Sequence, residues 1–188
     1  FGGGGFNPRD VTEPALFLTR WITHLCAPTF IFLAGLSAFL YGRGRSTGEL
    51  SRFLLTRGLF LMLIDLTVIK FGWRFEVDFF RVGAGVIFAI GASMIALAAL
   101  IWLPRFALAA VALLTIVGHN ALDGLRAEQF GAFGWIWRFL HEPGTVAAGG
   151  EATVYVVYPL IPWIGVMAAG YALGPAMQRA PEERRRVL

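Results

Sequence analysis

The feature that most constrains this chain is a series of five long apolar runs separated by polar segments. An α-helix of about 20 apolar residues, with a range of roughly 17–25, spans the hydrocarbon core of a bilayer. The sequence therefore predicts a single all-α domain over residues 1–188, a polytopic transmembrane helix bundle with about five membrane-spanning helices. The predicted spans are 19–41, 53–71, 82–103, 106–122 and 152–175.

The composition is that of an integral membrane protein and not of a water-soluble domain. Of the 188 residues, 57% are hydrophobic and 15% are charged, and the mean hydropathy is +0.66. Soluble domains have about 45–50% apolar and about 25% charged residues. The net charge of +4 comes from bases scattered through the polar segments, so we attribute it to membrane topology and expect no nucleic-acid partner.

The distribution of arginine and lysine predicts the orientation of the bundle. If the N-terminus lies outside, the inner segments are 42–52, the turn at Arg105 and the tail 178–188, and they hold eight bases against six in the outer segments. Inner loops are enriched in arginine and lysine. The expected topology therefore places the N-terminus outside and the C-terminus inside.

The longest connection is the outer loop 123–150. Its segment 130–144 is too short and too interrupted to span a membrane, but its Phe, Trp and Arg residues are typical of an interfacial or re-entrant helix over the outer mouth. An ordinary aromatic interfacial loop is the alternative. His141 and Glu142, within this segment, are interpreted as loop residues.

Polar residues on three of the predicted helices reach the outer half of the bundle. At 1.5 Å per residue, His24 lies roughly 25 Å from the inner end of its helix, Asp65 roughly 18 Å and His119 roughly 20 Å from theirs. Asn120 and Asp123 follow His119 outward. A carboxylate at this depth needs a partner.

Prolines are expected to free backbone carbonyl groups near these side chains. Pro28 should kink the first helix and free the carbonyl of His24, and Pro159 and Pro162 should do the same in the fifth helix. Arg20 lies four residues before His24, on the same helix face. The sequence thus predicts a polar, partly hydrated cavity under the outer face, lined by His24, Asp65, His119 and Asn120.

Each of these residues also has a structural interpretation. Arg20 can extend to the interface, His24 can be a packing histidine, and His119 with Asn120 can cap a helix end. The three histidines are far apart in sequence and the single cysteine is Cys26, so no metal site is expected. Phosphate-loop, nucleophile-elbow and zinc-protease motifs are absent.

Three blocks carry a resemblance to a known family: PALFLTRWITHLCAPTFIFLAGLSAFLY (14–41), GHNALDG (118–124) and YPLIPWIGVMAAGYALG (158–174). In this order they resemble bacterial members of the heparan-α-glucosaminide N-acetyltransferase catalytic-domain-like family. The resemblance implies a transmembrane acyltransferase of the bacterial cytoplasmic (inner) membrane. It also implies that acetyl from cytosolic acetyl-CoA passes to a sugar amine on the other side, with an essential histidine near that side.

The chain departs from the family pattern in two ways. Family members begin with a further helix and continue with several more after Gly174, so this chain resembles an internal part of a longer protein. The family's essential histidine precedes the helix that 19–41 matches, and residues 1–23 contain no histidine. A role for His24 is therefore a hypothesis from its position alone.

The first functional hypothesis is acyl transfer. His24 or His119 would act as general base or form an acyl-imidazole, with Asp65 or Asp123 orienting the ring. Arg20 would stabilise the oxyanion, and Asn120 would line the site. Arg43, Arg45 and Arg52 would bind the phosphates of the acyl-CoA donor, or would serve as topology determinants only.

The other hypotheses are a transporter or proton-relay bundle and a non-catalytic membrane subunit. Mid-membrane carboxylates suit a transporter, but no inverted repeat is visible. The expected partners are the lipid bilayer and a carbohydrate acceptor, and homo-oligomerisation is left open. The sequence does not identify the acceptor or the acyl group.

Overall fold

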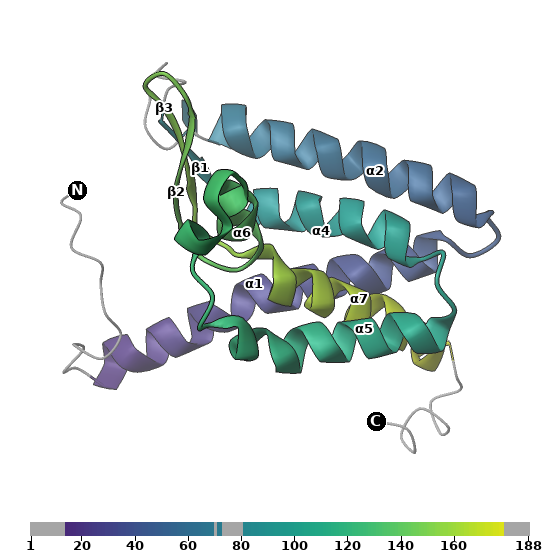
Figure 1. Ribbon diagram of the computed structural model, residues 1–188. Helices are drawn as coiled ribbons and strands as arrows, with labels where there is room; N and C mark the ends of the chain where they lie inside the picture. The colour runs from purple at the N-terminus through teal and green to yellow at the C-terminus, as the bar shows by residue number, and fades with distance from the viewer. Residues whose placement is uncertain (1–13, 70, 73–80, 179–188) are drawn as a thin grey trace.

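The computed structural model describes residues 14–69, 71–72 and 81–178. Five helices occupy the five predicted runs and confirm a mostly helical bundle (Figure 1). They alternate in direction along the chain, as short connections between antiparallel neighbours require. These helices are α1 (Pro14–Tyr41), α2 (Thr47–Ile64), α4 (Val86–Leu100), α5 (Arg105–Gly118) and α7 (Leu160–Met177).

Three helices in the described part of the chain are long and apolar enough to cross a membrane. They include the segments His24–Tyr41, Arg105–Leu122 and Leu160–Met177. α4 is equally apolar but has only 15 residues, and α2 carries Glu49, Arg52 and Arg57 among its 18 residues. The remaining two predicted spans are therefore helical, but one is short and the other carries several charges.

The start of α2 is fixed by a capping box. The backbone N–H and the hydroxyl of Ser46 donate to Oε2 of Glu49 at 2.8 and 2.9 Å, and the Glu49 N–H donates to Oγ of Ser46. Hydrogen bonds from the backbone and side chain of Ser46 hold the pKa of Glu49 below its ordinary value. The box satisfies two N–H groups that a helix start otherwise leaves unpaired.

The prolines of the fifth run begin a helix and do not interrupt one. Pro159 is the N-cap of α7, and Pro162 lies in its first turn, where an N–H has no partner within the helix. The prediction that they kink the fifth helix is wrong, because the chain before them is an extended strand that ends at Val156. α1, by contrast, continues through Pro28 as one helix.

A three-stranded sheet closes one end of the bundle and was not predicted. β1 (Arg81–Ala84) pairs in parallel with β3 (Ala152–Val156), which pairs in antiparallel with β2 (Gly144–Gly149). β1 and β3 begin the third and fifth apolar runs, so these runs start as strands. Their β-branched and aromatic residues favour extended backbone, and the hairpin turns at Gly149 and Gly150, both with positive φ.

Glycines let the helices cross closely. A Cβ at Gly35 in α1 would overlap the carbonyl of Met167 in α7, and a Cβ at Gly170 would overlap the carbonyl of Phe32. α2 and α4 approach in the same way at Gly58 and Gly91. A Cβ added to either glycine would overlap the carbonyl oxygen of the other. Backbone contact of this kind is the usual basis of helix association in membranes.

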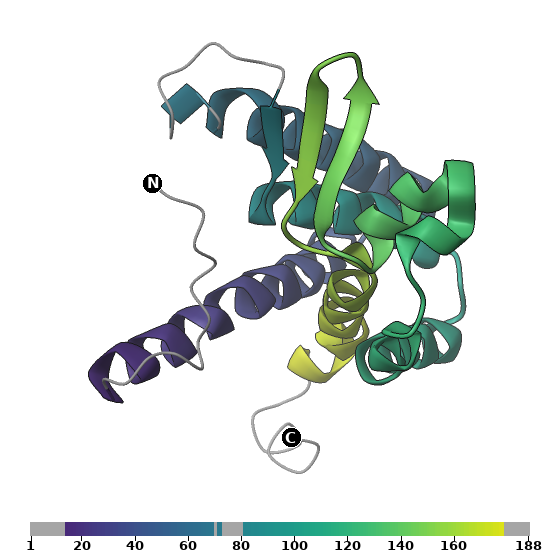
Figure 2. The ribbon, with the colours of Figure 1, turned by 60° about the vertical axis from the view of Figure 1, so that its left-hand side comes forward.

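The two ends of the bundle differ in structure (Figures 1 and 2). We call the end with β1, β2, β3 and the short helix α6 (Gly134–Leu140) the sheet end. The opposite end, with the α1–α2 loop (42–46) and the α4–α5 turn (101–104), is the turn end. The N-terminal part of α1 extends away from the other helices, and its apolar side chains, such as Trp21 and Ile22, are more than half exposed.

Candidate active site

Asp65 is buried at the sheet end, where the π-helix Asp65–Ile69 continues α2. Only 5% of the residue is exposed. Its Oδ2 accepts a hydrogen bond from the N–H of Gly85 at 2.8 Å, and the carboxylate also accepts from the N–H of Phe88. Gly85 is the N-cap of α4, so Asp65 binds the positive end of that helix. The sequence predicted that the Asp65 carboxylate needs a partner, and that partner is the N-terminus of α4.

Replacing Asp65 with alanine is expected to lower the free energy of unfolding by about 2–4 kcal/mol, because two backbone N–H groups lose their acceptor. Asp65→Asn should cost much less, since the amide oxygen still accepts. Thermal unfolding of both variants in detergent checks this. If Asp65→Asn keeps wild-type stability but abolishes turnover, the carboxylate has a chemical role besides capping.

His119 and Asn120 begin the 3₁₀ helix His119–Leu122, which follows α5. Nδ1 of His119 lies 2.8 Å from the carbonyl oxygen of Ile116, so this nitrogen carries the proton and Nε2 keeps its lone pair. Asn120 is exposed. His119 is therefore bound to its own helix, whereas Asp65 is bound to α4.

His24 is exposed in the N-terminal half of α1. The side chain of Arg20 lies outside the described residues. Three cavities, one beside α6, one at the turn end and one between α1 and α2, are lined by other residues. A cavity shared by His24, Asp65, His119 and Asn120 therefore stays a prediction.

Asp123 binds His141, which the sequence predicts to be a loop residue. Nε2 of His141 lies 3.0 Å from Oδ1 of Asp123. The His141 side chain is only 8% exposed, whereas the Asp123 side chain is 67% exposed. Nδ1 of His141 is buried and has no hydrogen-bond partner among the described residues. The ring of Trp137 lies 5.2 Å from the imidazole ring.

Besides the ion pair between Arg126 and Glu142, four cross-links hold the segment 123–142 together. Besides the His141–Asp123 bond, Nε1 of Trp137 donates to the carbonyl of Leu125 at 3.0 Å. Glu142 accepts from the N–H of Ala127, also near the start of the segment. The fourth link is an ion pair between Arg138 and Glu128, with 2.9 Å between Nη2 and Oε1. These bonds fix the position of His141.

The pair can perform acid–base chemistry. With the carboxylate as its partner, Nε2 of His141 carries the proton in the neutral ring, and Nδ1 is the basic nitrogen. The carboxylate also stabilises the imidazolium that forms when Nδ1 takes a proton. No local motif marks this pair, because its members are 18 residues apart. The only sequence signal was that both flank one aromatic segment.

A cavity lies at each end of the bundle. At the sheet end, a cavity of about 310 Å³ lies between α6 and β2 and is lined by Glu128, Trp135, Arg138 and Thr145, among others. At the turn end, a cavity of about 280 Å³ is lined by residues that include Arg105 and Tyr171. The first contains an aromatic ring with both charges of an ion pair, and the second contains the guanidinium of Arg105, 6.0 Å over the ring of Phe39.

The predicted phosphate-binding arginines lie at the turn end. Arg43, Arg45 and Arg52 are all exposed. Arg45 donates to the carbonyl of Tyr41 and lies 3.9 Å over its ring. Arg105 lies at the same end, on the wall of the cavity described above. Among the described residues, no group of three or more His, Cys, Asp or Glu side chains is arranged to hold a metal ion.

Comparison with protein families gives a match over nearly the whole chain. The family described as heparan-alpha-glucosaminide N-acetyltransferase, catalytic, matches residues 8–188. Comparison with curated proteins and with solved structures gave no match. The apolar helices and the family match together identify an integral membrane protein. The chain belongs to the family of heparan-alpha-glucosaminide N-acetyltransferase catalytic domains, which are acyltransferase-like membrane proteins.

Proposed function

We propose that the protein transfers an acyl group, acetyl in the simplest case, from acyl-CoA to an amine or hydroxyl of a carbohydrate across the membrane. The observation that carries this proposal is the pair formed by His141 and Asp123, with its basic Nδ1 free of any described partner. Family membership supports the reaction class. The pair supplies the base that such a reaction needs.

In the proposed step, Nδ1 of His141 takes a proton from the acceptor while the acceptor nitrogen or oxygen bonds to the thioester carbonyl carbon. The tetrahedral intermediate then collapses, the C–S bond breaks, and His141 returns the proton to the departing CoA sulfur. Asp123 stabilises the imidazolium between these events. Because Nδ1 is enclosed, the ring of Trp137 or helix α6 must shift to admit the acceptor.

The acceptor fits the sheet-end cavity beside α6. Trp135 is 54% exposed and offers an aromatic face to the apolar side of a sugar ring. Glu128 and Arg138 offer charged hydrogen-bonding groups next to it. Arg138, on the wall of this cavity, lies three residues before His141 in the sequence.

The donor phosphates fit the turn end, where Arg105 lines a cavity and where Arg43, Arg45 and Arg52 are exposed on the α1–α2 loop and the start of α2. The proposal therefore has the turn end on the cytoplasmic side of a bacterial inner membrane and the sheet end outside, which is the orientation expected from the arginine bias. The arm of the donor between its phosphates and its thioester must then span about 20 Å, the length of α5, to bring the thioester to His141.

His24 and His119 are the alternative bases. Nε2 of His119 has the lone pair that a base needs, but its ring is bound to a backbone carbonyl and not to a carboxylate. His24 is exposed in the N-terminal half of α1. His141 is the preferred assignment, because the carboxylate of Asp123 lies 3.0 Å from its ring and can stabilise an imidazolium.

The test uses the full-length protein in nanodiscs, supplied with acetyl-CoA and either glucosamine or glucose. The proposal predicts that CoA thiol appears faster with glucosamine than without acceptor, and that mass spectrometry finds the N-acetylated sugar. Glucose is the control that lacks the amine and has only hydroxyl groups. Saturable solute uptake into proteoliposomes, with no thiol release from any acyl-CoA, would overturn the proposal in favour of a transporter.

A further inference from the structure

A lateral groove of about 460 Å³ opens between α1 and α2, with α4 as its floor. α2 packs mainly on α4, and α1 packs mainly on α7, so α1 and α2 diverge. The groove is lined by apolar side chains except for Ser37 and Tyr41 on α1 and Arg57 on α2. It is therefore an apolar groove that carries one permanent charge.

The surface around the lateral groove is apolar. Leu33 and Leu40 on α1 are 46% and 44% exposed, and Leu59 and Phe60 on α2 are 59% and 50% exposed. In a membrane bundle, side chains of this kind face the acyl chains of lipids. An occupant of the lateral groove thus enters from the bilayer and not from water.

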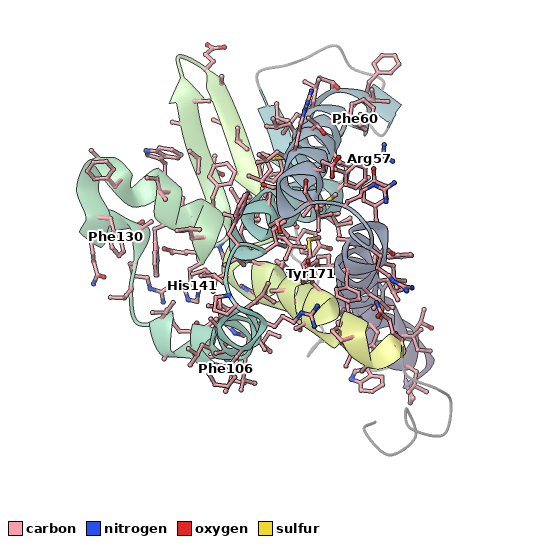
Figure 3. The ribbon with its side chains drawn as sticks, turned by 90° about the vertical axis from the view of Figure 1, so that its right-hand side faces the viewer. Arg57, Phe60, Phe106, Phe130, His141 and Tyr171 are labelled. Carbon is pink, nitrogen blue, oxygen red and sulfur yellow. The ribbon has the colours of Figure 1, made fainter. Side chains whose placement is uncertain are left out.

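Arg57 has no carboxylate partner among the described residues. The one acid on α1, α2 and α4, as far as the structure describes them, is Glu49, which is bound to Ser46. The guanidinium of Arg57 lies 6.0 Å over the ring of Phe60, and Figure 3 shows both on the side of the bundle away from His141. A cation inside a membrane span calls for an anion or for contact with the headgroups.

The position of Arg57 suits a lipid headgroup. It lies four residues, or about 6 Å, beyond Phe53, where the predicted span begins. Side chains on a helix lean toward its N-terminus, which for α2 is the turn end, and an arginine stem is long enough to cover that distance. Tyr41, stacked on Phe53 with 4.1 Å between ring centroids and covered by Arg45, marks the same end of the groove.

We propose that the lateral groove binds one acyl chain of an anionic phospholipid from the leaflet at the turn end, with the lipid phosphate paired to Arg57. An acyl chain gains little by exchanging lipid neighbours for apolar side chains. The selectivity of the site therefore comes from charge. A zwitterionic lipid with the same chains binds less, because its positive group opposes the arginine.

The experiment places the full-length protein in nanodiscs with equal parts of phosphatidylglycerol and phosphatidylcholine that carry identical chains. Native mass spectrometry then counts the lipids retained after gentle release. We expect wild-type protein to retain one phosphatidylglycerol in preference to phosphatidylcholine by about fivefold. Arg57→Gln should remove this preference, whereas Arg52→Gln, the same charge change on α2 at a residue that does not line the groove, should keep it.

Ser37→Phe is a second variant that fills the groove from its exposed side and keeps Arg57. It should reduce the retention of both lipids, while thermal unfolding confirms that each variant is folded. Equal retention of both lipids by wild type, or equal loss in Arg52→Gln and Arg57→Gln, overturns the proposal. So does a retained fatty acid, an acyl-CoA or a second protein copy in place of the phospholipid.

Discussion

Gly170→Val is expected to lower the free energy of unfolding by about 3 kcal/mol or more, because overpacking at a close helix crossing forces the backbones apart. A Cβ at this position would overlap the carbonyl oxygen and carbon of Phe32, which are backbone atoms and cannot rotate away. Valine adds two further methyl groups to the same contact. The α1–α7 crossing would have to open along its length.

The matched control is Gly118→Val, at the end of α5, where a Cβ meets no atom within 4 Å. Its effect should stay within about 0.5 kcal/mol, as for other substitutions on an open surface. Thermal unfolding and size-exclusion profiles in one detergent compare the two variants. Wild-type stability in Gly170→Val would mean that α1 and α7 do not cross at this glycine.

His141→Ala is expected to lower kcat for acyl transfer by about 10²–10⁴-fold, the usual contribution of a general base. The loss should appear with little change in KM, since the imidazole acts on the proton and not on the donor phosphates. Added imidazole should restore part of the rate, because the substitution leaves space for the ring next to Asp123. A purely structural role for His141 would not produce rescue.

Asp123→Asn keeps the shape of the partner but removes its charge, and should lower kcat by about tenfold or more. Because Asp123 is mostly exposed, this variant is expected to fold normally even if His141→Ala does not. His24→Ala and His119→Ala, measured beside it, identify the base. Loss of turnover in either of them, with full activity in His141→Ala, would reassign the role.

Length and apolarity were enough to predict the helices. Each apolar run has a helix, because a chain in lipid must satisfy its backbone groups within the segment. Strands β1 and β3 were missed because each is only four or five residues long and merges into an apolar run, where it has no period of its own. Hydropathy alone does not separate such strands from the helix that follows.

The candidate site was harder to predict, since its contacts are tertiary. Asp65 was singled out by its depth in a span, but its bonds to Gly85 and Phe88 depend on how α4 approaches α2. Asp123 was predicted to orient His24 or His119, whereas the structure pairs it with His141, which was predicted to be a loop residue. That choice depends on how α6 folds back on the segment after α5, which no periodicity in the sequence encodes.

The parallel pairing of β1 with β3 has a mechanical consequence. β1 ends one residue before Gly85, the group that Asp65 holds, and β3 ends shortly before α7 begins. The strand pair thus links the sheet-end termini of α2, α4 and α7. A displacement of one of these helices is therefore transmitted to the other two. α1 and α5 are not held by this strand pair and are joined to the linked helices mainly through their packing on α7, so their positions depend on side-chain packing and on close glycine contacts.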